Sequence, residues 1–196
     1  MQQSNLIRAI RFAHRKHTEV GQRRKWSNQP YITHPIAVVR LLMQYAEPTE
    51  TMLVAAALHD TVEDTNTTLE EIENNFGRDV AELVYWLTDA AKPEDGNRAT
   101  RMKINRDHIE AAPAEAQTIK AADSTHNLMR CVELAGGFAF KYIPEKRAAF
   151  EILHKADRLM LQVFDRVLTE QESQLKEKKL YHDRKRTDQK ATADAK

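Results

Sequence analysis

The chain has 196 residues, of which 41% are hydrophobic and 30% are charged, and its formal net charge at pH 7 is +1. This composition is typical of a folded globular domain and excludes a disordered chain, and the length is sufficient for one hydrophobic core. The near-neutral charge excludes a general basic surface for nucleic acid, so local groups must hold any anionic ligand. No apolar run is long enough to span a bilayer, so we expect no membrane partner.

Helical periodicity runs through almost the whole chain, and no sustained alternation typical of strands interrupts it. Thr68 and Glu71 form a capping-box pattern, Gly77 is predicted to end that helix, and Pro144 is predicted to open the last one. We therefore predict an all-α fold, a bundle of about eight helices. The expected helices are Asn5 to His17, Pro35 to Tyr45, Thr49 to Asp60, Thr68 to Asn75, Arg78 to Leu87, Arg98 to Ala111, Ala114 to Leu134 and Pro144 to about Glu172.

Three of the loops between these helices have features that bear on function. Residues 20–30 are basic, residues 90–97 are predicted to form a mobile flap, and residues 136–142 end in Tyr142, a candidate for contact with a nucleobase. After Glu170 the chain becomes rich in charge and poor in apolar residues. We predict one domain over residues 1–170 and a charged, partly disordered tail over residues 171–196.

The N-terminal segment and the single cysteine bear on the compartment. The N-terminal segment is amphipathic and punctuated by arginines, unlike a signal peptide. Cys131 has no second cysteine in the chain with which to form a disulfide. We expect a cytoplasmic protein with an inert, buried thiol, and we leave open a homodimer.

Four polar side chains follow the apolar run of residues 53–58. On a helix, Glu63 lies four residues after His59 and three after Asp60, and Asp64 lies four after Asp60, so the group converges on one flank. Carboxylates and an imidazole packed against an apolar segment perturb one another's protonation unless a cation or hydrogen bonds compensate. A divalent metal with an adjacent acid-base carboxylate explains the cluster. The alternative for Glu63 and Asp64 is a pair of solvated carboxylates at a fraying helix end.

Two more segments supply the remaining candidate metal ligands. His34 stands directly before Pro35 at a predicted helix start, where the alternative role is packing or capping. Asp123 and Asn127 lie four residues apart on one helical face. Together with His59 and Asp60 these segments offer two nitrogen and two oxygen ligands, a mixture that suits manganese, iron or zinc.

Cations for an anionic substrate are predicted in two places. Arg24 and Lys25 lie in the basic loop just before His34, where a phosphate-rich ligand would need them. Arg98 opens a basic helix at the end of the predicted flap, and its alternative role is that of a solvated surface residue.

Four sequence blocks occur in an order that resembles a known family. Arg24-Lys25, then QPYITHP, LHDTVEDT, and KAAD followed by HN, resemble the HD phosphohydrolase superfamily. They are more closely similar to the hydrolase domain of RelA/SpoT-type enzymes and to the free-standing small alarmone hydrolases. The similarity extends from about Leu6 to about Leu168.

The resemblance implies removal of the 3′-pyrophosphate from the alarmones ppGpp and pppGpp, giving GDP or GTP and pyrophosphate, with one Mn²⁺. It implies His34, His59, Asp60 and Asp123 as metal ligands, and it assigns acid-base catalysis to Glu63 with help from Asp64. Arg24, Lys25, Asn127, Tyr142 and Arg98 are the candidates for substrate contact.

One position departs from the family pattern. Ser124 stands where relatives carry a long cation, so a phosphate or base contact is lost or moved, with Arg98 and Lys103 as candidates for its new place. Adenine-based alarmones such as ppApp, or NADPH, therefore stay open as substrates. Two other classes also stay open: an HD phosphohydrolase acting on 5′-nucleotides, and a non-catalytic module that binds an alarmone.

Overall fold

The computed structural model describes residues 4–194 of the chain, and the side chains of residues 4–181. Within that range it contains eleven α-helices and two short 3-10 helices, and the only β contact is an isolated bridge between Arg23 and Pro30. The prediction of an all-α fold is confirmed. The helices are α1 Asn5–Glu19, α2 Thr33–Tyr45, α3 Glu50–Leu58, α4 Thr61–Asp64, α5 Leu69–Phe76, α6 Arg78–Leu87, η1 Pro93–Asp95, α7 Arg98–Ala111, α8 Ala114–Leu128, α9 Cys131–Leu134, η2 Gly136–Phe138, α10 Ala139–Phe150 and α11 Arg158–Asp194.

Local capping explains several helix boundaries that the sequence predicted. The hydroxyl of Thr68 accepts a hydrogen bond from the backbone N–H of Glu71 at the start of α5. Gly77 ends that helix with φ 93°, a conformation that side chains other than glycine rarely adopt. Asn97 accepts from Thr100 N–H at the start of α7. Thr68 and Asn97 each satisfy a backbone donor that has no partner inside its helix.

Three predicted helices are each split in two, which is why the structure has eleven α-helices instead of about eight. The helix predicted from Thr49 ends at Leu58, and the short α4 follows. The helix predicted from Ala114 ends at Leu128, because Arg130 adopts a left-handed conformation with φ 61° before α9. The helix predicted from Pro144 is split between α10 and α11.

The prediction that Pro144 opens a helix was wrong, because Pro144 lies inside α10. The segment of residues 136–142, predicted as a loop, instead forms η2 and the first turn of α10. The turn after α10 is held by polar side chains of α8. Lys155 N–H donates to Gln117 Oε1 at 2.9 Å, and Asp157 N–H donates to Thr118 Oγ1 at 2.9 Å.

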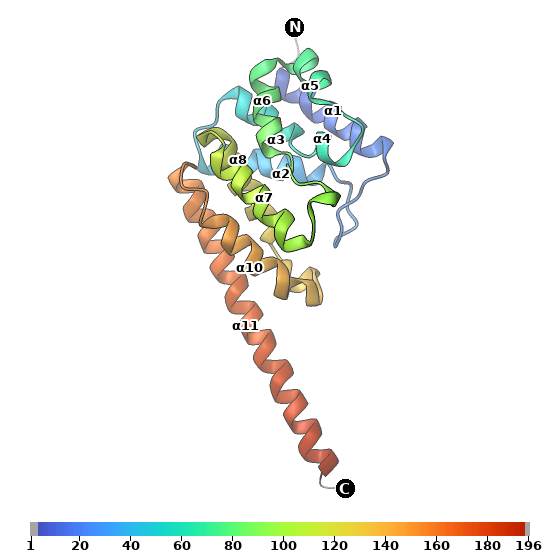
Figure 1. Ribbon diagram of the computed structural model, residues 1–196, viewed down its shortest axis with the longest axis vertical. Coiled ribbons are helices and arrows are strands. Elements are labelled where there is room, and N and C mark those ends of the chain that lie inside the picture. Colours follow the sequence, from blue (N-terminus) through green and yellow to red (C-terminus); the bar gives the residue numbers. More distant parts are fainter. Residues whose placement is uncertain (1–3, 195–196) are drawn as a thin grey trace.

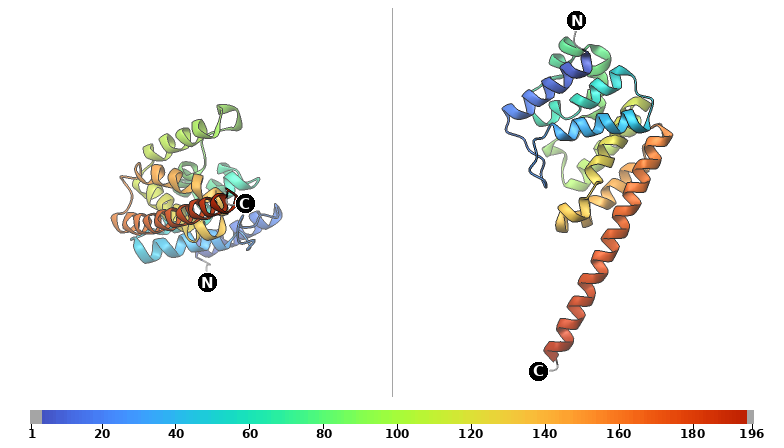
Figure 2. Two further views of the ribbon diagram at one scale, coloured as in Figure 1. Left: turned by 90° about the horizontal axis from the view of Figure 1, so that it is seen from below. Right: turned by 180° about the vertical axis from the view of Figure 1, so that it is seen from behind.

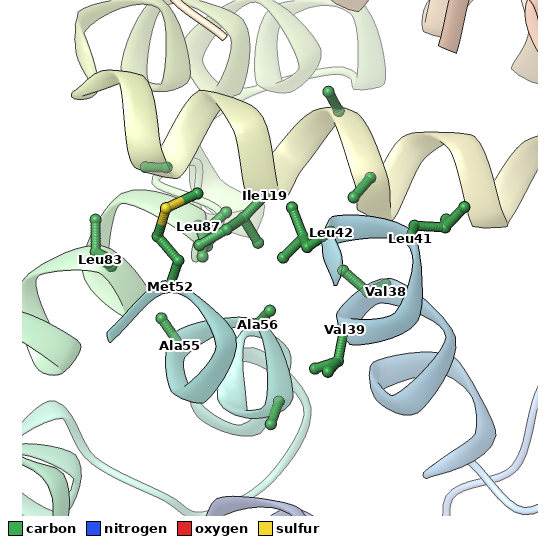
Figure 3. Close-up of a cluster of buried hydrophobic side chains, with 14 of the residues drawn as sticks. Val38, Val39, Leu41, Leu42, Met52, Ala55, Ala56, Leu83, Leu87 and Ile119 are labelled. Carbon is green, nitrogen blue, oxygen red and sulfur yellow. The ribbon is translucent and has the colours of Figure 1, made fainter. Parts of the chain in front are cut away.

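Helix α8 lies at the centre of the helical body, where it packs against α2, α3, α6 and α11 (Figure 1). Apolar side chains from α2, α3 and α6 meet Ile119 of α8 in one buried cluster (Figure 3). Burial of one such leucine or isoleucine contributes about 1.5–3 kcal/mol. The cluster holds α2, α3 and α8 in fixed positions, and the predicted metal ligands lie on α2, on α8 and in the turn that directly follows α3.

Helix α11 is continuous across residue 170, where the sequence predicts the end of the domain. Its first turns pack into the core through Met160, Phe164 and Leu168. Its C-terminal part extends away from the other helices (Figures 1 and 2). The division at residue 170 and partial disorder of the tail stay predictions. Among the described residues, no helix has both the length and the apolar character needed to cross a membrane.

Candidate active site and metal centre

The four predicted metal ligands come together from three parts of the fold. His34 lies in the first turn of α2, His59 and Asp60 lie in the turn between α3 and α4, and Asp123 lies on α8. His34 Nε2 is 3.2 Å from His59 Nε2 and 3.1 Å from Asp123 Oδ1. Asp60 Oδ2 is 3.0 Å from His59 Nε2 and 3.4 Å from His34 Nε2. Four donor atoms therefore surround one point.

The turn after α3 aims the His-Asp pair at this point. Thr61 donates its hydroxyl to the carbonyl of Leu58 at 2.7 Å, which satisfies one of the last carbonyls of α3. His59 Nδ1 donates to the carbonyl of Ala56 at 2.8 Å. Because a carbonyl only accepts, neutral His59 carries its proton on Nδ1 and presents the Nε2 lone pair to the cluster.

A second histidine fixes the orientation of His34. Nδ1 of His34 lies 2.7 Å from Nδ1 of His126, and the two rings are stacked. Burial and the proximity of His34 lower the pKa of His126 to about 4, so His126 is neutral and accepts this hydrogen bond. His34 then donates from Nδ1 and, like His59, keeps its Nε2 lone pair for the cluster.

The carboxylates are held by neutral donors. Tyr31 donates its hydroxyl to Asp60 Oδ2 at 2.6 Å. Asn127 donates its amide nitrogen to Asp123 Oδ1 at 2.6 Å. These contacts fix the direction of both carboxylates and leave oxygen lone pairs that face the histidines.

The donor set fits a divalent metal ion. One donor atom each from His34, His59 and Asp60 lies within 4.8 Å of the other two. Separations near 3 Å are those expected between neighbouring ligands that bind one ion at about 2.0–2.2 Å. Asp123 adds a second carboxylate, and two nitrogens with two oxygens suit a borderline ion. The structure brings all four residues together, and their individual roles as ligands stay a prediction.

The charges of neighbouring residues shift the pKa values of His59 and Asp123. Burial favours the neutral form of His59, but the Asp60 carboxylate, together with Asp123 and the carbonyl of Ala56, raises the pKa of His59 to about 9. Although burial opposes it, the charge of Lys120 holds the pKa of Asp123 well below its usual range. A metal requires neutral imidazole, so His59 must release a proton when a metal binds.

Glu63 and Asp64, the predicted acid-base pair, lie on α4, next to the candidate metal ligands. Glu63 accepts a hydrogen bond from the backbone N–H of Asp89 at 3.3 Å. Burial and the charge of Asp89 raise the pKa of Glu63 to about 7. Asp64 accepts from Gln22 Nε2 at 2.7 Å, and Gln22 Oε1 is 2.6 Å from His17 Nδ1. Glu63 is thus suited to proton exchange near neutral pH.

One cavity of about 830 Å³ joins these groups to the basic loop. The volume lies within the range of small-molecule sites. Its lining includes Asp60, Asp123, Glu63 and Asp64, a part that we call the metal end, and residues of the basic loop, a part that we call the basic end, and Arg24 joins the two through its hydrogen bond to Asn127. The cavity is also lined by all five residues predicted to contact substrate, namely Arg24, Lys25, Arg98, Asn127 and Tyr142.

Comparison with known proteins identifies the family. The HD domain family matches residues 9–135. The chain belongs to the HD domain family. It is 42% identical over 125 residues to guanosine-3′,5′-bis(diphosphate) 3′-pyrophosphohydrolase MESH1 of Xenopus tropicalis, covering 63% of this chain and 67% of that protein. It is 42% identical over 130 residues to the human protein of the same name, covering 64% of this chain and 68% of that protein.

A solved structure supports the same assignment at the level of the whole fold. It is described as a metazoan ortholog of SpoT that hydrolyses ppGpp and plays a role in starvation responses. The TM-score is 0.77 at 25% sequence identity, and the match covers 87% of this chain and 97% of that one. The resemblance read from the sequence blocks is therefore confirmed.

Arg24 and Arg98 differ in their partners within the cavity of this HD domain. Arg24 donates to the neutral Oδ1 of Asn127 at 2.8 Å. Arg98 forms a two-pronged ion pair with Glu145, with distances of 2.9 and 2.7 Å. Lys103 pairs with Asp107 outside the cavity lining. The guanidinium of Arg98 is therefore neutralised by Glu145, whereas Arg24 has no carboxylate partner among the residues whose side chains the structure describes.

The HD domain cavity also contains residues that the sequence blocks did not single out as site residues. Lys120 lies 3.4 Å from Asp123 Oδ2 and has helical i, i+3 spacing to it, a signal that was present in the sequence. Trp26 and Phe138 form an aromatic group with Tyr142, with Trp26 and Tyr142 centroids 5.8 Å apart. Lys146 reaches the cavity from α10, and no spacing rule links it to the motifs.

Proposed function

We propose that the protein is a metal-dependent hydrolase that removes the 3′-pyrophosphate from ppGpp and pppGpp, giving GDP or GTP and pyrophosphate. The observation that carries the proposal is the cavity itself. Its lining combines a metal-type donor cluster and an acid-base carboxylate with a basic loop and aromatic rings. The names of the MESH1 relatives and of the SpoT ortholog support the same reaction.

His34, His59, Asp60 and Asp123 would hold one divalent ion, for which we propose Mn²⁺. When bound, the ion would neutralise charge on phosphoryl oxygens and lower the pKa of water at the site. Tyr31, His126 and Asn127 hold the ligands in place through the hydrogen bonds described above. This arrangement needs little rearrangement on binding.

Glu63 would move the proton in the reaction. The oxygen of a water forms a bond to the phosphorus that carries the 3′ oxygen, the bond between that phosphorus and the 3′ oxygen breaks, and the 3′ oxygen leaves with a proton. With a pKa of about 7, Glu63 can accept the proton of the water and return it to the leaving oxygen. Asp64, held by Gln22, would orient Glu63 or the water.

The basic loop and the aromatic rings of the cavity would bind the nucleotide. Arg24 and Lys25 are cations with neutral partners, Asn127 and the ring of Phe138, and are suited to phosphate. Tyr142 and Trp26 offer ring surfaces to the base. Asn127 would contact the sugar or the base. A role for Arg98 would require the opening of its pair with Glu145.

A substrate panel tests the proposal. The purified full chain with added Mn²⁺ is incubated with ppGpp, pppGpp, ppApp, dGTP and NADPH, and anion-exchange chromatography resolves the products. We expect GDP and pyrophosphate from ppGpp, and no reaction in EDTA. Turnover of dGTP or NADPH with no turnover of ppGpp would overturn the proposal.

The proposal also covers the compartment, the partners and the oligomeric state of the protein. The substrate is a small nucleotide, so we propose a cytoplasmic enzyme that requires no nucleic acid partner, and we propose a homodimer. Light scattering on the full chain measures the assembly directly, and a monomeric mass across the working concentration range would remove the dimer.

A further inference from the structure

Lys146 is a cation in the cavity wall to which the proposed mechanism gives no role. It lies on α10, its Nζ donates to Ser124 Oγ at 3.2 Å, and it lies 5.2 Å from the centroid of the Tyr142 ring. Ser124 is fully buried, so the contact fixes the end of the lysine against α8. The side chain therefore has a defined place next to the metal-type cluster.

Three other cations, on α7, α8 and α10, have carboxylate partners, unlike Arg24 and Lys25 of the basic loop. Lys120 is paired with Asp123, Arg98 with Glu145, and Arg147 of α10 with Asp165 and Glu172. Among the residues whose side chains the structure describes, no carboxylate oxygen lies within 4.0 Å of Lys146 Nζ. In the same described part of the chain, its only hydrogen-bond partner is the neutral hydroxyl of Ser124, and the Asp123 carboxylate acts on it through its charge without a direct contact, so the ammonium can still bind an anion.

The position of Lys146 indicates which part of a ligand it meets. Ser124 directly follows Asp123 on α8, and Arg24 contacts Asn127 one turn further along the same helix. Lys146 and Arg24 thus approach the end of α8 from two different elements, and both line the cavity. An anion held next to Asp123 would lie within reach of Lys146.

We propose that Lys146 binds a phosphate oxygen of the substrate beside Asp123, and that the small side chain of Ser124 gives it room and a hydrogen-bond acceptor. The proposal rests on the proposed function. Arg98 and Lys103, the places considered from the sequence, are already paired with Glu145 and Asp107.

The first test compares Lys146→Met with the matched control Lys141→Met, an exposed lysine on the same helix that does not line the cavity. Loss of one charge-assisted hydrogen bond should raise KM for ppGpp by about 10- to 100-fold with a smaller fall in kcat, because the contact is made before the transition state. Lys146→Arg should retain most of the affinity. An unchanged KM in Lys146→Met would overturn the proposal.

Moving the positive charge from position 146 to position 124 distinguishes phosphate binding from a structural role of Lys146. Ser124 Oγ and Lys146 Nζ are 3.2 Å apart, so a lysine at position 124 can direct its ammonium into the space that Lys146→Ser vacates. The double variant Ser124→Lys/Lys146→Ser should have a lower KM than Lys146→Ser alone. Equal KM values for the two variants would overturn the proposal. If Lys146→Met does not fold, as judged by circular dichroism, this pair and Lys146→Arg decide the question.

Thermal stabilisation by inorganic pyrophosphate provides a readout that does not depend on turnover. A ligand that binds only the folded state raises Tm. Pyrophosphate should stabilise the wild-type chain and the Lys141→Met control more than Lys146→Met, and equal stabilisation of all three would contradict the inference. If the wild-type enzyme does not hydrolyse ppGpp, the proposed function fails, whereas this measurement still decides whether Lys146 binds phosphate.

Discussion

The two ends of the cavity differ in how firmly their side chains are held. At the metal end, His34 and His59 are each 1% exposed, and each polar group contacts two or more others. At the basic end, Arg24 has one neutral hydrogen-bond partner and Lys25 is exposed over the ring of Phe138. The difference indicates that the groups assigned to chemistry are fixed before substrate binds, whereas the groups assigned to binding can adjust to it.

The largest expected effect is at the metal end. Asp123→Ala removes one proposed ligand and leaves Lys120 without its carboxylate, so activity should fall by about a thousandfold or more and metal content should fall with it. Steady-state kinetics and elemental analysis of the purified protein measure both, with the exposed Asp107→Ala as the control. A fully active Asp123→Ala enzyme would show that the two ends do not differ in this way.

Glu63→Gln should cut kcat by about a hundredfold while metal stays bound, because it keeps size and hydrogen bonding but removes the exchangeable proton. Near wild-type turnover would instead place Glu63 outside the chemistry. The same substitution should raise the folding stability of the metal-free protein near neutral pH, although it lowers activity. The folded-state pKa of Glu63, about 7, exceeds its ordinary value of 4.5, so the stabilising effect of its proton is lost as pH rises toward 7.

It follows that metal-free Glu63→Gln should be more stable than the metal-free wild-type protein above pH 7 and equally stable well below pH 4.5. Thermal melts across this pH range measure the difference. A stability difference that does not depend on pH would contradict the raised pKa.

A smaller effect is expected at the basic end, where Arg24 and Arg98 form a matched pair. Arg24→Met should raise KM by about tenfold or more with little change in kcat, because Arg24 is not neutralised within the protein. Arg98→Met should have a weaker effect on KM, because Glu145 already occupies its guanidinium. Kinetics on guanine and adenine alarmones show which part of the substrate each arginine contacts. An equal rise in KM for both substrates indicates contact with phosphate or ribose, and a rise for one substrate alone indicates contact with the base. Equal effects of Arg24→Met and Arg98→Met on KM would contradict the difference that we infer from their partners.

The parts of the fold that the sequence predicted depend on local interactions. The hydroxyl of Thr68 and the positive φ of Gly77 act within a few residues, and α6 and α7 have the bounds that periodicity predicted. The metal cluster was predictable for a related reason, because His59 and Asp60 are adjacent in the chain and the order of the blocks matched a known family.

The parts that the sequence mispredicted, or for which it gave no prediction, depend on contacts between distant residues. The turn between α10 and α11 contains neither glycine nor proline, and it forms because Gln117 and Thr118 accept hydrogen bonds from residues 38 and 39 positions later. The contact between His34 and His126 joins residues 92 positions apart. The place of Lys146 in the cavity likewise depends on where α10 packs. Sequence spacing carries no information about these pairs.

Asn127 connects the two ends of the cavity through a single amide. Its carbonyl accepts from Arg24, and its amino group donates to Asp123. A phosphate that draws Arg24 away removes one of the two partners that fix this amide, so the environment of Asp123 changes when the basic loop is occupied. By thermodynamic reciprocity, a change in nucleotide affinity on metal loading requires an equal change in metal affinity on nucleotide binding. We therefore expect Asn127 to couple metal binding to nucleotide binding, which a shift in metal affinity in the presence of GDP would measure.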